Sequence, residues 1–593
     1  MSRRLYITFI FTLCLAASSM VSIAMACGGE PELCEEAPTA TTQAATGVLS
    51  RSATLHGSVN PQGCSTTYEF RYGLKAGEYP YLAGSGNAGS GKSNVSEEVT
   101  YAAFLPGTTY HYHITATSFA GSADGGDQTF TTLAEEPSVT TEAATSVTKT
   151  GATLNGSVNA NGESTSYYFE YGLTTSYEKT TGSGSVSGTS SEKVSKAITG
   201  LDPGTTYHFR IVATNGHGTK KGSDKTFETK ALTSSIQTVS NPTGAKSSRF
   251  YSISCTSASA CTSVGEYVNG SSVQVPLAER WNGEKWSAQS PPSPGEATSS
   301  ELLGVSCTTS TACAASGSYV KGGVRRVLVE VWNGLEWSVQ TAAEPAETTS
   351  AELSTISCTS STACTAVGRY TAKGNPTMLA ERWDGTKWTI QTTPSPSEAK
   401  ESSLLGVSCT SSTSCVATGY YYNNAGTRLT LAEIWNGSEW SVQTTSNREG
   451  ATKNILLGVS CTSSTACTAV GADNPSGGGP QETLVERLSG SKWTIESSPN
   501  PSGSEASVLH GVSCTSATLC VTVGDYVNAK LTNVTLAERW NGNSWSLEST
   551  TDPAGATFSA LWSVACPSGV ECVESGYYKD GSGVDWALTE KSS

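Results

Sequence analysis

The chain is 593 residues long and carries a formal net charge of −15, with 51 acidic and 36 basic residues. Nucleic acids and anionic membrane surfaces attract basic proteins, so this charge argues against both as partners. The length is sufficient for several domains, each with a hydrophobic core of its own.

The first 26 residues have the pattern of a secretory signal peptide. Arg3 and Arg4 precede an apolar run over residues 5–17, and residues 24–26 (Ala-Met-Ala) form a small-x-small cleavage site. The apolar run is too short to span a bilayer, and no later stretch has 18 consecutive apolar residues. We therefore expect export of the chain without residues 1–26 and without a transmembrane span.

Cys27 follows the cleavage site directly, at the start of a linker over residues 27–37. A cysteine at this place resembles a bacterial lipoprotein signal, in which the cysteine carries a lipid anchor. If Cys27 is lipidated, Cys34 and Cys64 can form a disulfide, whereas without the lipid one of the three cysteines is odd. Both alternatives remain open, and the protein is predicted to be secreted or held at a bacterial cell surface.

Residues 38–133 and 137–230 form a twofold internal repeat. The run ATLHGSVNPQGCSTTYEFRYG from Ala53 matches ATLNGSVNANGESTSYYFEYG from Ala152. Alternating apolar and polar residues with many turns, in modules of about 95 residues, favour a β-sandwich for each copy.

Both copies also contain a Pro-Gly-Thr-Thr-Tyr-His motif, LPGTTYHY in the first and DPGTTYHF in the second. Together with the strand and the Ala-Thr that follow, this motif resembles the fibronectin type III module. The resemblance implies a tyrosine corner at Tyr110 and Tyr207, in which the hydroxyl group bonds to the backbone a few residues upstream. Cys64 lies outside the frame of the module, which agrees with a bond from Cys64 to Cys34.

Residues 231–593 contain a longer repeat, with a period of about 51 to 53 residues. Each copy has four short runs rich in Val, Ile, Thr, Tyr and Trp and no helical periodicity, which is typical of a four-stranded propeller blade. In the third copy we expect strands over residues 353–358, 364–370, 378–383 and 387–392. A Trp-Asn-Gly or Trp-Asp-Gly sequence after the third run predicts a tight hairpin with a primed turn.

The seventh copy ends with its third strand, residues 586–591, and lacks a fourth. Residues 235–238, at the front of the array, have the sequence of the missing strand. A borrowed outer strand leaves no open sheet edge. We therefore predict an all-β protein with two fibronectin type III-like β-sandwiches and a seven-bladed β-propeller closed by an N-terminal outer strand.

A C-x5-C pair occurs in every copy, at the turn between the first two strands, where it can bridge the hairpin. Zinc is a weaker interpretation because the array contains a single histidine, His510. Neither a metal nor another cofactor is therefore predicted. The predicted disulfides of the array are Cys255–Cys261, Cys307–Cys313, Cys358–Cys364, Cys409–Cys415, Cys461–Cys467, Cys514–Cys520 and Cys566–Cys572.

A glutamate recurs in the third strand of every copy, and a role present seven times is predicted to be structural. We expect it to accept hydrogen bonds from backbone amides of a neighbouring loop or blade. All 13 tryptophans lie in the array, and most are predicted to pack between blades. Trp562 and Trp586 break the pattern and are predicted to make exposed contacts. The glutamates are Glu279, Glu330, Glu381, Glu433, Glu486, Glu538 and Glu590.

Function is expected where the copies differ, because ligands of propellers commonly meet variable loops near the mouth of the channel. The residue after the glycine of the second strand varies between copies, and so do the loops that follow, including an excursion at residues 475–480. The alternative is that these positions are variable solvent-facing loops. The candidate ligand-binding residues are Glu266, Arg369, Tyr420, Asp525, Tyr577, Arg325, Arg326, Asp585 and Trp586.

Neither a G-x-S-x-G nor an H-E-x-x-H motif is present, and the Asp-box of sialidase-like propellers is absent, so no catalytic residue is assigned. The first functional hypothesis is a monomeric surface-binding or adhesion protein for a glycan or protein ligand. A second is an extracellular carbohydrate-active enzyme, with Glu266, Asp525 and Asp585 as its candidate acids. A third is a structural component of the cell envelope.

Overall fold

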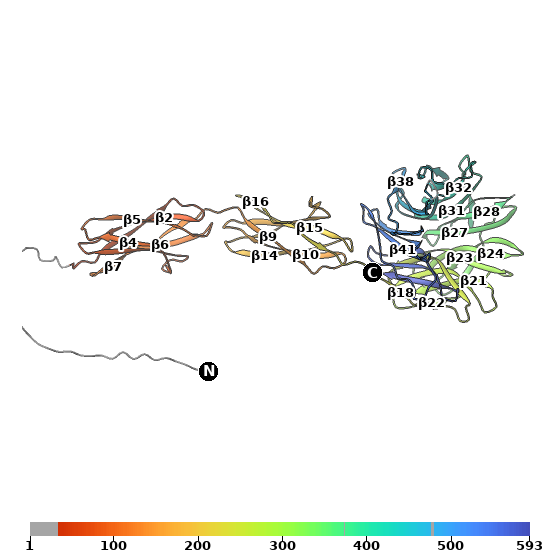
Figure 1. Ribbon diagram of the computed structural model, residues 1–593, viewed down its shortest axis with the longest axis horizontal. Coiled ribbons are helices and arrows are strands. Elements are labelled where there is room, and N and C mark those ends of the chain that lie inside the picture. Colours follow the sequence, from red (N-terminus) through yellow and green to blue (C-terminus); the bar gives the residue numbers. More distant parts are fainter. Residues whose placement is uncertain (1–33, 373, 476–478) are drawn as a thin grey trace, which may run out of the picture. The chain divides into compact units, whose positions relative to one another are not determined.

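The computed structural model describes residues 34–372, 374–475 and 479–593 (Figure 1). The predicted signal peptide, Cys27 and residues 476–478 of the predicted excursion lie outside these ranges. Every regular element that the described ranges contain is a β-strand, so the protein is all-β as predicted. In the same ranges no helix has the length and apolar character needed to cross a membrane.

The first eight strands form a β-sandwich. One antiparallel sheet has the order β1-β2-β5, and the other has the order β4-β3-β6-β7 with β8 also paired to β6. Leu55, Phe70 and Tyr112 belong to the buried core that both sheets share. The strands are β1 (Thr39–Thr46), β2 (Ser52–Asn60), β3 (Thr66–Gly73), β4 (Tyr81–Gly89), β5 (Val95–Ala102), β6 (Thr109–Ser118), β7 (Gly121–Asp124) and β8 (Gln128–Thr131).

The next nine strands repeat this arrangement. One sheet has the order β14-β10-β9, and the other has the order β12-β11-β15-β16, with β13 paired to β11 and β17 paired to β15. Leu154, Phe169 and Ile211 are fully buried. The strands are β9 (Ser138–Thr145), β10 (Gly151–Asn159), β11 (Thr165–Gly172), β12 (Lys179–Thr180), β13 (Gly184–Val186), β14 (Ser191–Thr199), β15 (Thr206–Asn215), β16 (Gly218–Lys221) and β17 (Lys225–Glu228).

Each sandwich contains the predicted tyrosine corner. The Tyr110 hydroxyl accepts a hydrogen bond from the backbone N–H of Leu105 at 2.9 Å. The Tyr207 hydroxyl accepts one from the N–H of Asp202 at 3.0 Å. Both tyrosines are buried, so the bond satisfies a polar group that would otherwise be costly to place in the core.

The remaining strands pair antiparallel within each of the seven sequence repeats. Single parallel bridges join the second repeat to the third and the sixth to the seventh, which gives five sheets in all. The first strands are β19 (Ser247–Ser257), β23 (Ser299–Thr309), β27 (Thr348–Ser360), β31 (Glu401–Ser411), β35 (Ile455–Ser463), β39 (Ala506–Ser516) and β43 (Phe558–Ala565). The second strands are β20 (Ala260–Val268), β24 (Ala312–Lys321), β28 (Ala363–Ala372), β32 (Ser414–Tyr422), β36 (Ala466–Asp473), β40 (Leu519–Val527) and β44 (Cys572–Lys579).

The third and fourth strands form the other half of each repeat. The third strands are β21 (Gln274–Trp281), β25 (Val324–Trp332), β29 (Asn375–Trp383), β33 (Arg428–Trp435), β37 (Glu482–Ser489), β41 (Asn533–Trp540) and β45 (Asp585–Ser592). The fourth strands are β22 (Trp286–Gln289), β26 (Trp337–Gln340), β30 (Trp388–Gln391), β34 (Trp440–Gln443), β38 (Lys492–Glu496) and β42 (Trp545–Leu547).

The sheet of the seventh repeat is completed by β18 (Ser234–Gln237), from the other end of the array. β18 pairs antiparallel with β45, with Ile236 opposite Glu590. The Ser234 hydroxyl also donates to the Glu590 carboxylate at 2.5 Å. The predicted pairing with the C-terminal strand is therefore confirmed for residues 235–237, whereas Thr238 lies outside β18. Figure 1 shows β18 beside the blue end of the chain.

Serine hydroxyls link the first strands of consecutive repeats. In six junctions the hydroxyl accepts a hydrogen bond from the backbone N–H of the first cysteine of the next repeat, at 2.9 to 3.1 Å. At the junction of the seventh and first repeats, the Ser563 hydroxyl accepts from the N–H of Ile253 at 3.2 Å. The seventh repeat thus contacts the first, as each repeat contacts the next. The acceptor serines of the six junctions are Ser254, Ser306, Ser357, Ser408, Ser460 and Ser513.

Each apolar cluster of the array combines residues from two consecutive repeats, so the repeats share their cores. Val264 of the first repeat packs in one cluster with Leu302 and Trp332 of the second. Trp281 of the first repeat packs in another with Val573 of the seventh. The predicted packing of most tryptophans between repeats is confirmed.

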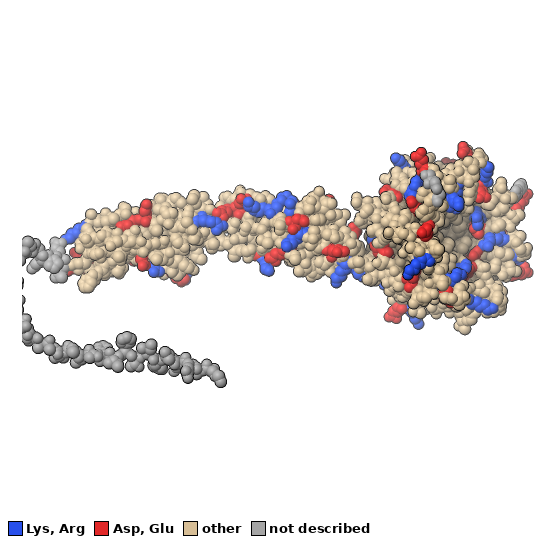
Figure 2. All heavy atoms as spheres, viewed as in Figure 1, with Lys and Arg blue, Asp and Glu red and all other residues tan. Residues whose placement is uncertain are grey.

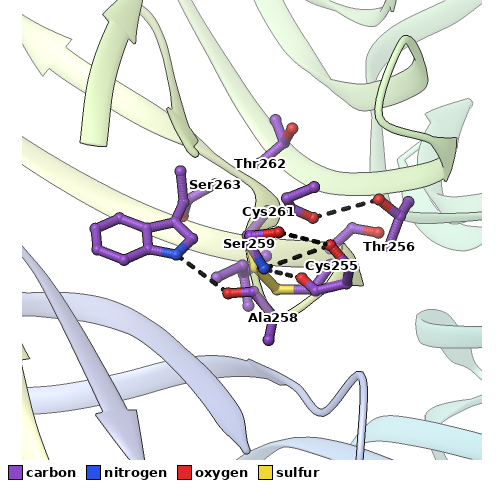
Figure 3. The surroundings of a disulfide bond; sticks show 12 residues. Cys255, Thr256, Ala258, Ser259, Cys261, Thr262 and Ser263 are labelled. Carbon is purple, nitrogen blue, oxygen red and sulfur yellow. Dashed lines mark hydrogen bonds between the residues drawn. A yellow bond between two sulfur atoms is a disulfide. The ribbon is translucent and has the colours of Figure 1, made fainter. Parts of the chain in front are cut away.

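All predicted disulfides are present. Each of the seven in the array joins the first two strands of one repeat, with Cα atoms 3.9 to 4.1 Å apart. Figure 3 shows the first of them, between Cys255 and Cys261. Cys34 pairs with Cys64, with a Cα–Cα distance of 5.1 Å. In the chain-entropy model each short loop in the array contributes about 2 kcal/mol of stability.

The turn between the third and fourth strands differs from the prediction. Trp281 and Trp286 face each other across a four-residue loop in which Gly283 has a φ of 97°. The Asn282 side-chain oxygen accepts the backbone N–H groups of Glu284 and Lys285. A primed turn needs positive φ at both central residues, so the predicted turn type is wrong. An Asx-type hydrogen bond holds the loop instead.

The recurring glutamates are almost fully buried, each at most 1% exposed. Burial raises the pKa of every one of them to about 7 or 8. Four of them accept a backbone N–H from the segment that joins the preceding repeat to their own, as predicted. These pairs are Ser240 to Glu279, Ala343 to Glu381, Ser446 to Glu486 and Thr551 to Glu590, at 2.9 to 3.1 Å.

Glu330 and Glu433 have no hydrogen-bond partner among the described residues. Each donor residue stands 15 positions before the first cysteine of its repeat. At this position the repeat of Glu330 has Pro292, and the repeat of Glu433 has Pro394. Proline has no backbone N–H to donate. The sequence of the joining segment therefore decides which buried carboxyl groups are stabilised.

Glu538 shows how one repeat compensates for the same substitution. Pro499 stands at the donor position of its joining segment. The hydroxyl of the preceding residue, Ser498, donates to the Glu538 carboxylate at 2.7 Å instead. A side-chain donor therefore replaces the missing backbone amide.

We expect Glu433→Gln to stabilise the array at alkaline pH only. The pKa of Glu433 is raised from 4.5 to about 8 in the folded chain, so the stability that its protonated form supplies below pH 4.5 is lost as pH rises to 8. The neutral amide avoids a buried charge and should increase the free energy of unfolding at pH 8.5 by roughly 2 kcal/mol. Urea titration followed by tryptophan fluorescence measures this, because every tryptophan lies in the array. An equal gain at pH 4.5 would contradict the explanation.

Exchanging the donor residues should have opposite effects at two junctions. Pro394→Ala gives Glu433 a backbone donor, and we expect about 1 kcal/mol of stabilisation at pH 8.5 after the entropic effect of losing proline. Ala343→Pro removes the donor to Glu381 and should destabilise by about 2 kcal/mol. Proline occurs naturally at this position in other repeats, so the backbone accommodates it. Urea midpoints that move in the same direction for both variants would disprove the proposed pairing.

Candidate functional site

A cavity of about 440 Å³ is lined by the first strands of all seven repeats. The strands approach closely at small residues in its wall. A Cβ atom at Gly511 would lie 2.9 Å from the Cα of Ser563, and one at Gly458 would lie 2.8 Å from the carbonyl oxygen of His510. Only small residues fit there, so the larger side chains that define the cavity come from other positions.

One position in the wall divides the repeats into two groups. The first, sixth and seventh repeats place the aromatic residues Tyr251, His510 and Trp562 there. The second to fifth repeats place small or aliphatic residues there: Leu303, Ser354, Leu405 and Leu457. Since the seventh repeat contacts the first, the three aromatic residues are neighbours. The Trp562 ring stacks on His510 at 4.3 Å and meets Tyr251 edge to face at 5.8 Å.

Tyr577, one of the predicted ligand-binding residues, extends this group. Its ring stacks with Trp562 at a centroid distance of 6.2 Å, and the Arg249 guanidinium lies over the ring, 5.0 Å from its centre. Burial raises the pKa of the Tyr577 hydroxyl, which therefore stays protonated at neutral pH. We call Tyr251, His510, Trp562 and Tyr577 the aromatic cluster.

The three asymmetric acids of the sequence prediction lie around the aromatic cluster. Glu266 accepts a hydrogen bond from the Tyr251 hydroxyl at 3.0 Å. Asp525 contacts the His510 imidazole at 2.8 Å. Asp585 pairs with the Arg249 guanidinium at 2.5 Å, and Arg249 also lies 3.5 Å from Glu266. The structure thus brings together residues of the first, sixth and seventh repeats.

Burial raises the pKa of Glu266, and the neighbouring Glu301 carboxylate raises it further. Two polar atoms of the aromatic cluster are buried and have no hydrogen-bond partner in the described chain: Nδ1 of His510 and Nε1 of Trp562. Buried polar atoms in proteins are normally satisfied by protein, water or ligand. The cluster therefore combines aromatic faces with hydrogen-bonding capacity that its own residues do not use.

Two further predicted residues, Arg325 and Arg369, form an ion-pair network beside this region. Arg325 pairs with Glu301 at 2.5 Å and lies 3.7 Å from Glu352, and Arg369 pairs with Glu352 at 2.9 Å. Gln274 connects Glu301 to Glu266 through its side-chain amide. Charges of opposite sign alternate here, and Figure 2 shows acidic and basic side chains interspersed on the visible face of the repeats.

The other predicted residues lie outside the aromatic cluster. The Tyr420 ring packs against Tyr422, with the Arg428 guanidinium 5.6 Å from its centre. Arg326 pairs with Glu344. The Trp586 indole donates to Asp580 of its own hairpin at 2.9 Å and does not line the cavity.

No group of three or more His, Cys, Asp and Glu side chains in the described ranges is arranged to bind a metal ion. His111 and His113 alternate on β6, but each bonds to a different carboxylate, Asp127 and Asp124 respectively, at 2.8 Å. The pair of histidines therefore stabilises the edge of its own sheet.

Tyr251 and His510 are site residues that strand alternation in the sequence does not indicate. Both lie where the register of the first and second strands shifts, between Phe250 and Ser252 in the first repeat and between Leu509 and Gly511 in the sixth. A bulge re-aims the side chain, so strand alternation does not predict its direction. The signal in the sequence is an aromatic residue at the same position of the first strand in the first, sixth and seventh repeats.

Residues 86–93 (GNAGSGKS) match the phosphate-binding pattern G-x-x-x-x-G-K-S. That motif requires a loop between a strand and a helix. Here the segment runs from the end of β4 through a turn into β5, and both neighbours are strands. The match is therefore a glycine-rich hairpin and not a nucleotide site.

No family model and no curated protein matches the chain. The sensor domain of the anti-sigma factor RsgI4 of Pseudobacteroides cellulosolvens is 23% identical, with 18% of this chain and 99% of that chain covered and a TM-score of 0.15. The FN1–FN3 domains of chicken CNTN1 are 9% identical, with 50% and 98% covered and a TM-score of 0.24. A protein of unknown function from Dyadobacter fermentans is 10% identical, with 60% and 97% covered and a TM-score of 0.36. At these TM-scores the similarities carry no argument about the site.

We expect Arg249→Met to destabilise the array more than Arg369→Met. Arg249 joins the first repeat to the seventh through Asp585, and its loss leaves Glu266 without a cation and Asp585 with Lys579 alone, whereas Arg369 pairs within one repeat. Because both arginines are partly exposed, we expect losses of about 2 and less than about 1 kcal/mol at pH 7. Urea titration at pH 7 and pH 4 checks this. The larger loss should shrink at pH 4, because burial raises the pKa of Glu266 and favours its protonation there, and a pH-independent loss would contradict it.

Proposed function

We propose that the protein is an extracellular binding protein in which residues 231–593 form a seven-bladed β-propeller. The pairing of β18 with β45, the contact between the seventh and first repeats, and a cavity lined by all seven first strands support this arrangement. Residues 38–133 and 137–230 are, on this proposal, two fibronectin type III-like modules, supported by their two-sheet structure and tyrosine corners.

Export of the protein is supported by its cysteines. Eight disulfides favour an oxidising compartment. They leave two of the 18 cysteines unused, Cys14 inside the proposed signal peptide of residues 1–26 and Cys27 directly after it. We propose that Cys27 carries a lipid that holds the protein at the cell surface, since this assignment leaves the exported chain without a free thiol.

The ligand that best fits the aromatic cluster is a carbohydrate. A sugar ring has an apolar C–H face, which packs against aromatic side chains such as those in the cavity wall, and a rim of hydroxyl groups, which bond to carboxylates. Glu266 and Asp525 lie beside the aromatic cluster. The unpartnered Trp562 Nε1 adds a donor. The cavity of about 440 Å³ has the size of a small-molecule site. The single observation that carries the proposal is the stacked Trp562–His510 pair in the cavity wall.

Turnover of the sugar is less well supported than binding. Each asymmetric acid already has a partner that holds it in one place: Tyr251 and Arg249 for Glu266, His510 for Asp525, and Arg249 for Asp585. A glycosidase needs one protonated and one free carboxyl group facing the same bond. The arrangement therefore favours recognition.

The test is a glycan array and a polysaccharide pull-down with the full exported chain, compared with its Trp562→Ala and Trp586→Ala variants. We expect Trp562→Ala to weaken binding at least tenfold, because it removes the stacking surface, and Trp586→Ala to bind normally, because Trp586 does not line the cavity. Released sugars would favour the carbohydrate-active enzyme. Retention of no glycan at all would overturn the proposal and favour a structural role.

A further inference from the structure

Arginine side chains join several pairs of consecutive repeats in one recurring way. Three of them reach from the end of a third strand to the next repeat, where the guanidinium lies 4.4 to 4.7 Å from the centre of a tryptophan ring. Each also donates to a backbone carbonyl in the turn between the first two strands of that repeat. The groups are Arg280 with Trp332 and Ser310, Arg382 with Trp435 and Ser412, and Arg487 with Trp540 and Ala517.

The second repeat has Val331 at the position of these arginines. The junction of the second and third repeats contains a cavity of about 170 Å³, lined among others by Val331, Trp383, Trp388 and the turn residue Ser361. At the junction where Arg487 is present, the corresponding space is about 10 Å³. The cavity is therefore the space that a guanidinium fills elsewhere in the same molecule.

The tryptophan of this junction is also more exposed than its counterparts. Trp332, Trp435 and Trp540, which lie under an arginine, are 6 to 7% exposed. Trp383 occupies the same position in the third repeat and is only half-buried. The face that an arginine covers in other repeats is therefore accessible here.

The fourth repeat shows that loss of the arginine does not by itself leave such a space. Ile434 replaces the arginine there, and Leu488 replaces the tryptophan of the next repeat. Both residues belong to one apolar cluster, which fills the junction. At the junction of the second and third repeats, Trp383 is present but Val331 replaces the arginine. The aromatic ring that contacts a guanidinium at other junctions therefore has no arginine from its own chain.

We propose that this cavity binds the guanidinium group of an arginine side chain from a partner protein. The flat cation would lie on Trp383 and donate to the carbonyl oxygen of Ser361, as the arginines of other junctions do with the corresponding residues. Arginine fits better than lysine because the guanidinium groups at the other junctions are planar, and each stacks on a tryptophan ring while it donates to a backbone carbonyl. The net charge of −15 favours approach of a basic partner. This site is separate from the proposed carbohydrate site and does not depend on it.

The test measures binding of L-arginine amide to the full exported chain by saturation-transfer NMR. L-citrulline amide, which has nearly the same shape without the charge, is the matched ligand, and indole tests whether the cavity takes an apolar ring instead. We expect L-arginine amide to bind at least fivefold more tightly than L-citrulline amide. Equal binding of the two, or binding of indole alone, would overturn the proposal.

Val331→Arg is the decisive variant, because it places the missing guanidinium in the cavity. The same residue occupies this position in other repeats, so we expect the variant to fold and its urea midpoint to equal or exceed that of the natural chain. Binding of L-arginine amide should fall at least tenfold. Ile434→Arg adds the same charge at another junction and should leave binding unchanged.

A second variant keeps the test informative if Val331→Arg does not fold. Trp383→Leu removes the aromatic face and leaves the neighbouring strands in place, as Leu488 does in the fifth repeat. This variant should also weaken the binding of L-arginine amide at least fivefold, while binding at the proposed carbohydrate site should be unchanged. L-arginine amide that binds both variants as it binds the natural chain would place its site elsewhere and overturn the proposal.

Discussion

The hydrogen bonds between β18 and β45 are the interaction on which the rest of the array depends. They give the last repeat its fourth strand, and the first repeat then packs against the seventh through Ser563 and Ile253. Without this contact, Tyr251 would not lie beside Trp562, and Arg249 would not reach Asp585, which is 336 residues away in the chain. The aromatic cluster is therefore a product of the contact between the first and seventh repeats and of no single repeat.

Residues that recur in every repeat form the fold, and residues that differ between repeats form the candidate sites. Buried glutamates, paired cysteines and interstrand serines recur because each solves the same packing problem at every junction. Where one residue changes, the physical environment changes with it: proline removes a donor at Pro394, and valine opens a cavity at Val331. Likewise, the first, sixth and seventh repeats place aromatic residues in the cavity wall where the other repeats have leucine or serine.

The sequence was sufficient to predict features that depend on spacing. The C-x5-C pairs and the borrowed strand follow from fixed distances along the chain, and both are present. The hairpin turn was predicted wrongly because the Asn282 side chain bonds two amides, which a two-residue turn model ignores. The wall position of Tyr251 could not be predicted because a bulge decides its direction. Glu266, Asp525, Tyr577 and Asp585 stand at positions that vary between repeats, and the packing of the sixth, seventh and first repeats brings them together.

β18 is synthesised long before β45, the strand with which it pairs. Ser234 and Glu590 bond to each other across 356 positions of the chain. At translation speeds of about 5 to 20 residues per second, β18 waits roughly 20 to 70 s for its partner. During that time it is an unpaired edge that could join another chain. A protein of this design therefore gains from delaying its final assembly until the whole array has been synthesised.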